Sequence, residues 1–303
     1  MSLLIQGMRR SGTTILFDAL LEDPEVRGFY EPLREQDVTV GGGSGAREDD
    51  AFAATRERRE RFAREHYPRL SVDEFNWGGP RDPSLELRAG LPDHVRDFLA
   101  SLIAVGPGVA IKETRLYRKL PAVAELDPSA GLVHLVRDPR AVVTSTMLGR
   151  GRRHAESYPS ADAFFEARTK RKLWSSRALS EGIIGTRDSG VAKWRRPPDF
   201  ARVLAVWGYA FEQTRRGAEA FGDRRLQLRH EDLAADPDAA LARVYELLKR
   251  PLPDVVSRWA RDNVRTPSEV PFGDDPRWAD AAERLGISDA VSAAGYAPDQ
   301  RLG

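Results

Sequence analysis

The chain has 303 residues, of which 41% are hydrophobic, and this is enough apolar material for a sizeable core. Its 47 Lys and Arg nearly balance 46 Asp and Glu, so the overall charge gives no reason to expect a nucleic-acid-binding or membrane-surface protein. The lack of cysteine excludes disulfides, thiolate zinc sites and a cysteine nucleophile, and no apolar run approaches the ~20 residues of a membrane span.

The first predicted element is a short apolar strand, Leu3–Gln6, which is followed by a glycine turn and an amphipathic helix from Thr13 to Leu21. Because the strand begins so near the first residue, we expect no signal peptide and a cytoplasmic location. The turn and the start of the helix read "GMRRSGTT", residues 7–14, and are called the donor loop below.

The donor loop has the features of an anion-binding site. Backbone N–H groups of a glycine turn and of the following helix N-terminus point at one spot, and the helix dipole favours an anion there. Arg9 and Arg10 add positive charge, and the planar guanidinium of Arg10 suits a tetrahedral oxyanion. The predicted ligands of this anion are Arg10, Ser11, Gly12, Thr13 and Thr14.

A P-loop kinase is the first alternative for this loop, but its lysine would stand where the chain has Thr13. Phosphoryl transfer also needs carboxylates for magnesium, and no apolar run ends in a suitable Asp. A sulfuryl group carries less charge and can be handled by such donors without a metal.

The next hundred residues contain irregular insertions. The glycine-rich and acidic stretch 37–50 predicts a loop, and the charged stretch 53–65 predicts a helix whose charges face solvent. The turn-rich stretch 71–92 completes a first insertion, 35–100.

Three more apolar runs predict buried strands, at Val109–Lys112, Leu132–Val136 and Leu226–Arg229. Helical patterns separate them. The sequence therefore predicts an α/β fold of the P-loop-like three-layer α/β/α type, with a central mainly parallel sheet and helical insertions. Since no internal repeat or second glycine loop occurs, we expect one domain, 1–303, with insertions at 35–100 and 150–200.

The run "LVHLVRDPRAVVTSTM", 132–147, carries a second candidate site. The strand ends at Arg137, Asp138 is the predicted N-cap, and Pro139 stands at the first helical position. Arg137 is thus expected at the carboxyl edge of the sheet, where open α/β sheets bind ligands. Ser145 follows eight residues later.

Together these two motifs resemble those of sulfotransferases that use 3′-phosphoadenosine 5′-phosphosulfate (PAPS). The donor loop looks like their 5′-phosphosulfate loop, and "RDPRAVVTS" is similar to their 3′-phosphate motif, which implies that Arg137 and Ser145 hold the 3′-phosphate. The resemblance implies PAPS as donor, adenosine 3′,5′-bisphosphate (PAP) as product, and no metal.

Weaker matches continue to the end of the chain. The run "LQLRHEDLAADPDAALARVYELL" resembles a family segment in which a tyrosine often lies beside the adenine, and here His230 stands at that place. His230 is therefore a candidate contact to the donor. The ending "AAGYAP" resembles the tail of some members.

Glu31 is the candidate general base. Carbohydrate and tyrosylprotein sulfotransferases look alike here, with a Glu base at a matching distance from the loop, whereas "IKETRLYRKL" lacks the His that phenol and steroid sulfotransferases use. Pro32 predicts an extended Glu31. The alternative is a surface carboxylate paired with Arg34. His134, inside a strand, is expected to be a hydrogen-bonded core residue.

Lys112 ends a predicted strand and is a candidate to stabilise charge on the leaving phosphate, its alternative being a surface charge. The resemblance predicts transfer of a sulfuryl group from PAPS to a hydroxyl of a saccharide or other small molecule, and we expect the insertions 35–100 and 150–200 to form the pocket for this acceptor. A P-loop phosphotransferase and a non-catalytic nucleotide-binding or interaction protein, docking through the arginine-rich stretch 56–64, are the alternatives. No pattern specifies an oligomeric state.

Overall fold

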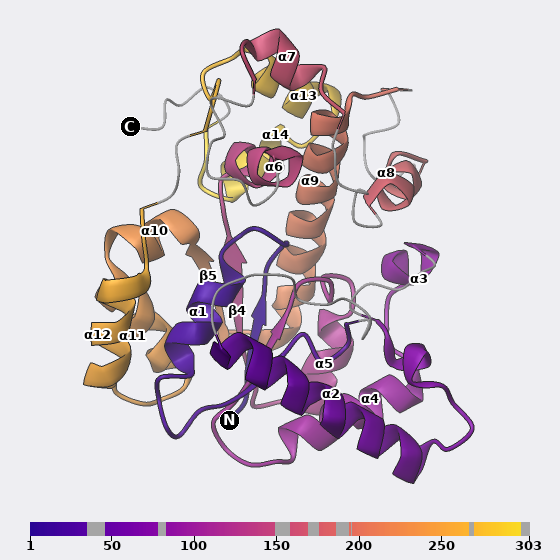
Figure 1. The fold of residues 1–303 in the computed structure, drawn as a ribbon, viewed down its shortest axis with the longest axis vertical. Helices are drawn as coiled ribbons and strands as arrows, with labels where there is room; N and C mark the ends of the chain where they lie inside the picture. The colour runs from indigo at the N-terminus through magenta and orange to yellow at the C-terminus, as the bar shows by residue number, and fades with distance from the viewer. Residues whose placement is uncertain are drawn as a thin grey trace.

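The computed structural model describes residues 1–34, 46–77, 83–148, 158–168, 176–185, 194, 196–266 and 270–297. Within this part of the chain, five parallel strands form one sheet in the order β2-β3-β1-β4-β5 (Figure 1). The strands are β1 (Leu3–Gln6), β2 (Arg27–Tyr30), β3 (Val109–Glu113), β4 (Gly131–Val136) and β5 (Arg225–Arg229).

The strand register brings the carboxyl ends of four strands to one edge of the sheet. Gln6 at the end of β1 is level with Glu113 on β3 and His134 on β4, and Tyr30 at the end of β2 is level with Lys112. The chain runs from β1 to β2 and β3 on one side and then crosses β1 to reach β4 and β5 on the other, so the order of the strands reverses between β1 and β4, which is where open α/β sheets bind ligands.

The four strands predicted from apolar runs are confirmed, but β2 was missed. Its sequence "RGFY" is short, begins with an exposed Arg27, and buries only Phe29 and Tyr30. Such a segment lacks a strong periodic signal, so pairing with β3 decides its conformation.

Helices cover both faces of the sheet, as the three-layer prediction requires. Alternate residues of β1 point to opposite faces: Ile5 joins one core cluster and Leu4 the other. The first face is covered by α1 (Thr13–Leu20), α10 (His230–Ala235), α11 (Pro237–Leu247) and α12 (Asp254–Asn263). The second is covered by α2 (Ala46–His66), η1 (Val72–Phe75), α4 (Asp93–Ile103), α5 (Leu120–Leu126) and η5 (Ala218–Phe221).

The prediction for residues 37–50 was wrong in part. Residues 37–45 lie outside the described part of the chain, but 46–50 belong to α2 and are helical. Helix α2 is also not purely solvated, because Ala63 and Arg59 are buried. The helix continues because it packs on β2 and η1.

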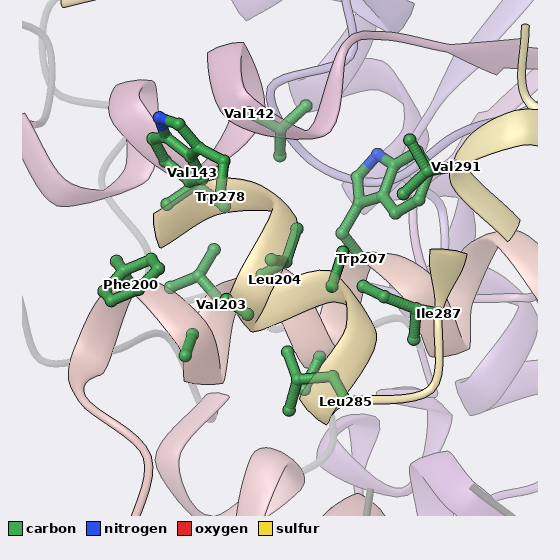
Figure 2. Close-up of a cluster of buried hydrophobic side chains, with 14 of the residues drawn as sticks. Val142, Val143, Phe200, Val203, Leu204, Trp207, Trp278, Leu285, Ile287 and Val291 are labelled. Carbon is green, nitrogen blue, oxygen red and sulfur yellow. The ribbon is translucent and has the colours of Figure 1, made fainter. Parts of the chain in front are cut away.

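A third core cluster lies beyond the carboxyl edge of the sheet, at the top of Figure 1. Figure 2 shows Val142, Leu204, Trp207, Trp278 and Val291 packed together from four helices. The cluster is built from α6 (Pro139–Leu148), α7 (Ala161–Phe165), α9 (Asp199–Gly217), α13 (Arg277–Arg284) and α14 (Ser288–Ala293).

Two short helices from the insertions, α3 (Pro83–Leu87) and α8 (Ser176–Gly185), pack against each other. Among the helices that the structure describes, none combines the length and apolar character needed to cross a membrane.

Candidate active site

The donor loop connects β1 to α1. Ser11 N–H donates to the Met8 carbonyl over 3.0 Å, and two residues adopt positive φ, Arg10 at 76° and Gly12 at 90°. Gly12 is the N-cap of α1, with no side-chain cap and no acid in the first turn. The N-terminus of α1 therefore keeps its affinity for an outside anion.

Two glycines of the donor loop are required by close packing. A Cβ on Gly7 would lie 2.4 Å from the Leu135 carbonyl oxygen, and a Cβ on Gly12 would lie 2.4 Å from His230 Nδ1. The loop thus fits tightly between β4 and the start of α10.

We expect Gly12→Ala to destabilise the protein more than Gly222→Ala. Both glycines have positive φ, which costs an alanine about 1–2 kcal/mol, but a Cβ at Gly222 meets nothing within 4 Å. Since only the first alanine also collides with His230, its melting temperature should be lower by about 2 °C or more in calorimetry. Equal melting temperatures would show that the His230 ring moves aside without cost.

The two predicted phosphate motifs meet in the structure. Arg10 Nε donates to Ser145 Oγ over 2.7 Å, and Arg137 Nη1 donates to the Arg10 carbonyl over 3.2 Å. Trp207 Nε1 donates a hydrogen bond to the Arg137 carbonyl over 3.2 Å, so the third core cluster fixes the end of β4. Residues 135 positions apart in sequence therefore form one cationic and hydroxyl-bearing site.

Two buried nitrogens at this site lack a hydrogen-bond partner in the described part of the chain, Arg137 Nε and His230 Nδ1. Burial lowers the pKa of Arg137, and burial together with Arg137 lowers the pKa of His230 to about 4. His230 is thus a neutral imidazole at pH 7. Unsatisfied buried donors and acceptors are costly, so they fit a site for a polar ligand.

Tyr296, near the end of the described chain, stabilises the segment around Arg137 and His230 through Glu231. Tyr296 OH donates to Glu231 Oε2 over 2.5 Å, Glu231 Oε1 accepts from the Asp138 N–H over 3.1 Å, and the Arg229 guanidinium lies 4.6 Å from the Tyr296 ring centre. The predicted capping by Asp138 is confirmed, because its Oδ1 accepts from the Arg140 N–H over 2.7 Å.

Glu31 lies at the end of β2, one strand beyond β3 from the donor loop, and begins a turn, residues 31–34, called the base turn. The predicted extended conformation was wrong: Glu31 has a φ of 40°. The Glu31 N–H donates to the Lys112 carbonyl over 2.8 Å, and the Arg34 N–H donates to the Glu31 carbonyl over 3.0 Å. These bonds override the preference that Pro32 imposes.

The Glu31 carboxylate is buried between two cations. Oε1 contacts Lys112 Nζ directly, and Oε2 lies 3.0 Å from Arg34 Nη1. Burial alone would raise the pKa of Glu31, but Lys112 and Arg34 outweigh it and lower the pKa to about 2. The alternative of a surface carboxylate was therefore right about the Arg34 pair and wrong about the exposure.

Lys112 lies between Glu31 and the Tyr30 ring, and Tyr30 in turn contacts the donor loop. It is only 2% exposed, so the surface-charge alternative was wrong, and its Nζ lies 4.0 Å from the centre of the Tyr30 ring. Tyr30 OH is 3.2 Å from Thr14 Oγ1 of the donor loop. Although burial opposes it, the Glu31 charge raises the pKa of Lys112, which is charged at neutral pH.

Residues 2–180 match the sequence model of the sulfotransferase family, which covers more than half of the chain. The protein belongs to the sulfotransferase family. This membership supports the resemblance to PAPS-dependent sulfotransferases that the donor loop and the Arg137 motif suggested, and it supports a sulfotransferase enzyme.

A solved structure has a similar fold. The sulfotransferase STF9 from Mycobacterium avium is similar with a TM-score of 0.53 and 16% identity, over 99% of this chain and 78% of that chain. A sulfotransferase from Alicyclobacillus acidocaldarius has a TM-score of 0.46 and 15% identity, over 97% of this chain and 95% of that chain. The comparison with curated proteins gave no match.

Sequence reasoning missed two residues that hold the base turn of this sulfotransferase. Arg59 of α2 donates through Nη1 to the carbonyls of Pro32, at 3.0 Å, and Arg34, at 2.6 Å. Glu113 at the end of β3 accepts the Leu33 N–H over 2.9 Å. Neither stands in a motif, so no local signal distinguishes them from ordinary charged residues.

Of the other four histidines of the chain, the structure describes three, His66, His94 and His134. His94 Nε2 lies 3.0 Å from the Glu74 carbonyl, and His66 ends α2, while residue 154 is outside the described residues. His134 is buried against Phe211 as expected, but no hydrogen bond of its ring is found among the described residues. No group of three His, Asp or Glu in those residues is arranged to hold a metal ion.

Proposed function

We propose that the protein transfers a sulfuryl group from PAPS to the hydroxyl of a saccharide or other small-molecule acceptor. The observation that carries this proposal is the meeting of the donor loop with Arg137 and Ser145 at the edge where Glu31 and Lys112 also lie. Two neighbouring anion sites suit a donor that carries a 5′-phosphosulfate and a 3′-phosphate. A carboxylate beside them can accept the proton of the acceptor hydroxyl.

In this proposal the donor loop binds the 5′-phosphosulfate through backbone N–H groups, the hydroxyls of residues 11, 13 and 14, and the Arg10 guanidinium. Arg137 and Ser145 bind the 3′-phosphate, and the unpartnered Arg137 Nε supports this assignment. The neutral His230 ring, packed against Gly12, is the proposed contact to the adenine of the donor.

Glu31 acts as the general base. As the acceptor oxygen bonds to sulfur, its proton passes to the Glu31 carboxylate, and the bond from sulfur to the 5′-phosphate oxygen breaks. Lys112, now paired with Glu31, stabilises the charge that develops on that phosphate oxygen. As Lys112 turns toward the donor, the pKa of Glu31 rises toward its usual range and the carboxylate becomes a better base.

The two insertions, 35–100 and 150–200, form the acceptor side of one domain. Support comes from a small apolar cluster in which Leu87 of α3 and Leu179 of α8 pack beside Met8 of the donor loop. Its other members are Ile183, Val206 and Tyr209. An apolar wall with Tyr209 suits the ring face of a sugar or a hydroxylated natural product. The likeness to carbohydrate enzymes and the cytoplasmic location stay predictions.

Calorimetric titration with PAP, ADP and ATP, each with and without magnesium, tests the donor assignment. We expect PAP to bind at least tenfold more tightly than ADP, with an affinity that magnesium does not change, because the 3′-phosphate has its own site. Product formation from PAPS with a panel of hydroxylated acceptors then tests transfer.

Preference for ATP with magnesium would contradict the proposal and favour the phosphotransferase alternative. Binding of none of the three nucleotides would favour the non-catalytic alternative.

A further inference from the structure

Glu113 is a buried carboxylic acid that the proposed reaction does not use. It ends β3, directly after Lys112, and its side chain is 0% exposed. Oε1 accepts the Leu33 N–H over 2.9 Å, while Oε2 is buried with no hydrogen-bond partner in the part of the chain that the structure describes. Burying a carboxyl group with an oxygen that lacks a hydrogen-bond partner lowers the stability of the fold, so the presence of Glu113 here needs a structural or functional reason.

The contact of Glu113 falls in the middle of the base turn. The base turn holds Glu31 in a left-handed conformation that side chains rarely adopt, so surrounding contacts must stabilise it. Arg59 binds two carbonyls of the turn, and Glu113 binds the N–H that lies between them in sequence. Arg59 thus stabilises the turn as a hydrogen-bond donor and Glu113 stabilises it as an acceptor. Leu33, whose N–H Glu113 accepts, is fully buried.

The charge state of Glu113 suits a hydrogen-bonding rather than an ion-pairing role. Burial and the neighbouring Glu31 carboxylate raise the pKa of Glu113 to about 7, against smaller opposing effects of Lys112 and of the Leu33 and Thr114 amides. At or below neutral pH a large share of Glu113 is therefore protonated. In that form its carbonyl oxygen can accept the Leu33 N–H while Lys112 stays with Glu31.

We propose that Glu113 is a positioning residue that fixes the base turn through the Leu33 N–H, so that the Glu31 carboxylate faces Lys112 and the acceptor. The catalytic part of this inference rests on the proposed function. The turn requires a hydrogen-bond acceptor at this position and does not require a negative charge.

Two volume-matched variants separate these requirements. Glu113→Gln keeps an oxygen that can accept the Leu33 N–H, whereas Glu113→Met fills the space without an acceptor. Exposed Glu125→Ala is the control for loss of a carboxylate elsewhere. For each protein we would measure hydrogen exchange of a peptide covering the base turn, PAP affinity by calorimetry, and kcat and KM for sulfuryl transfer.

We expect Glu113→Met to speed exchange in the base turn and to lower kcat by about 10–100-fold, as loss of an orienting contact typically does, with PAP affinity within about twofold of the unmodified protein. Glu113→Gln should restore slow exchange and most of kcat. The control should match the unmodified protein in every measurement.

Slow exchange and full kcat in Glu113→Met would overturn the proposal. So would equal loss of kcat in both variants, since that would show a need for the carboxylate itself. If the unmodified protein binds no PAP and forms no product, the proposed function fails by itself, and the exchange measurement still decides whether Glu113 fixes the turn.

Discussion

Glu31→Gln is expected to lower the rate of PAPS-dependent sulfuryl transfer by about 10²–10⁴-fold, the usual contribution of a positioned general base. An amide cannot take the acceptor proton, while its oxygen and nitrogen fill the same space. PAP affinity, measured by calorimetry, should change little because the proposed phosphate contacts lie on the donor loop and on β4–α6. Transfer that persists at the normal rate would exclude Glu31 as the base.

The substitution also leaves Lys112 buried opposite a neutral side chain. The depressed pKa of Glu31 means that its ion pairs stabilise the fold above the ordinary carboxylate pKa, and that this stability is lost as pH falls toward about 2. At neutral pH, breaking a buried pair typically costs about 3–5 kcal/mol, so Glu31→Gln should melt at a lower temperature.

A matched double variant separates this loss of stability from the loss of catalysis. Glu31→Gln combined with Lys112→Met removes both charges and should regain much of the melting temperature while remaining inactive. If activity returned together with stability, the defect of the single variant would be one of folding, and the role of Glu31 as base would be rejected.

Arg137→Ala is expected to weaken PAP binding by about a hundredfold. A charge-assisted hydrogen bond is worth about 1.5–3 kcal/mol, and the upper value corresponds to about two powers of ten in affinity. ADP lacks the 3′-phosphate, so its weaker binding should change less. Calorimetry with both nucleotides gives the comparison.

Arg216→Ala is the matched control, because this arginine lies at the exposed end of α9, with 64% of its side chain exposed, and should leave PAP affinity unchanged. An equal loss for PAP and ADP in Arg137→Ala would place Arg137 at the 5′ end of the donor or in the support of the loop. The assignment of the 3′-phosphate to β4–α6 would then be wrong.

The structure of the donor loop and the position of Arg137 at the sheet edge could be predicted because their determinants are local. A glycine turn before a helix, and a strand ending in Arg before Asp-Pro, fix backbone geometry within a few residues of each other, so both motifs and their place at the sheet edge follow from short stretches of sequence. The fold class follows likewise from apolar runs separated by helical patterns. The identity of Glu31 as base candidate came from resemblance, and its role stays a prediction.

The surroundings of Glu31, in contrast, depend on tertiary structure. Strand β2 forms because β3 offers a partner, and Glu31 turns left-handed because Lys112 and Arg34 hold its backbone and carboxylate. The contacts of β2 and Glu31 with β3 join residues about eighty positions apart, so no local pattern encodes them.

By itself, the sequence determined four of the five described strands, a glycine loop with the features of an anion site, and an arginine at the edge of the sheet. The tertiary structure decided that the Arg10, Ser145 and Arg137 groups meet and that Lys112 is buried against Glu31. The physical reason is that backbone turns and apolar periodicity act over a few residues, whereas burial and ion pairing depend on which distant segments the fold brings together.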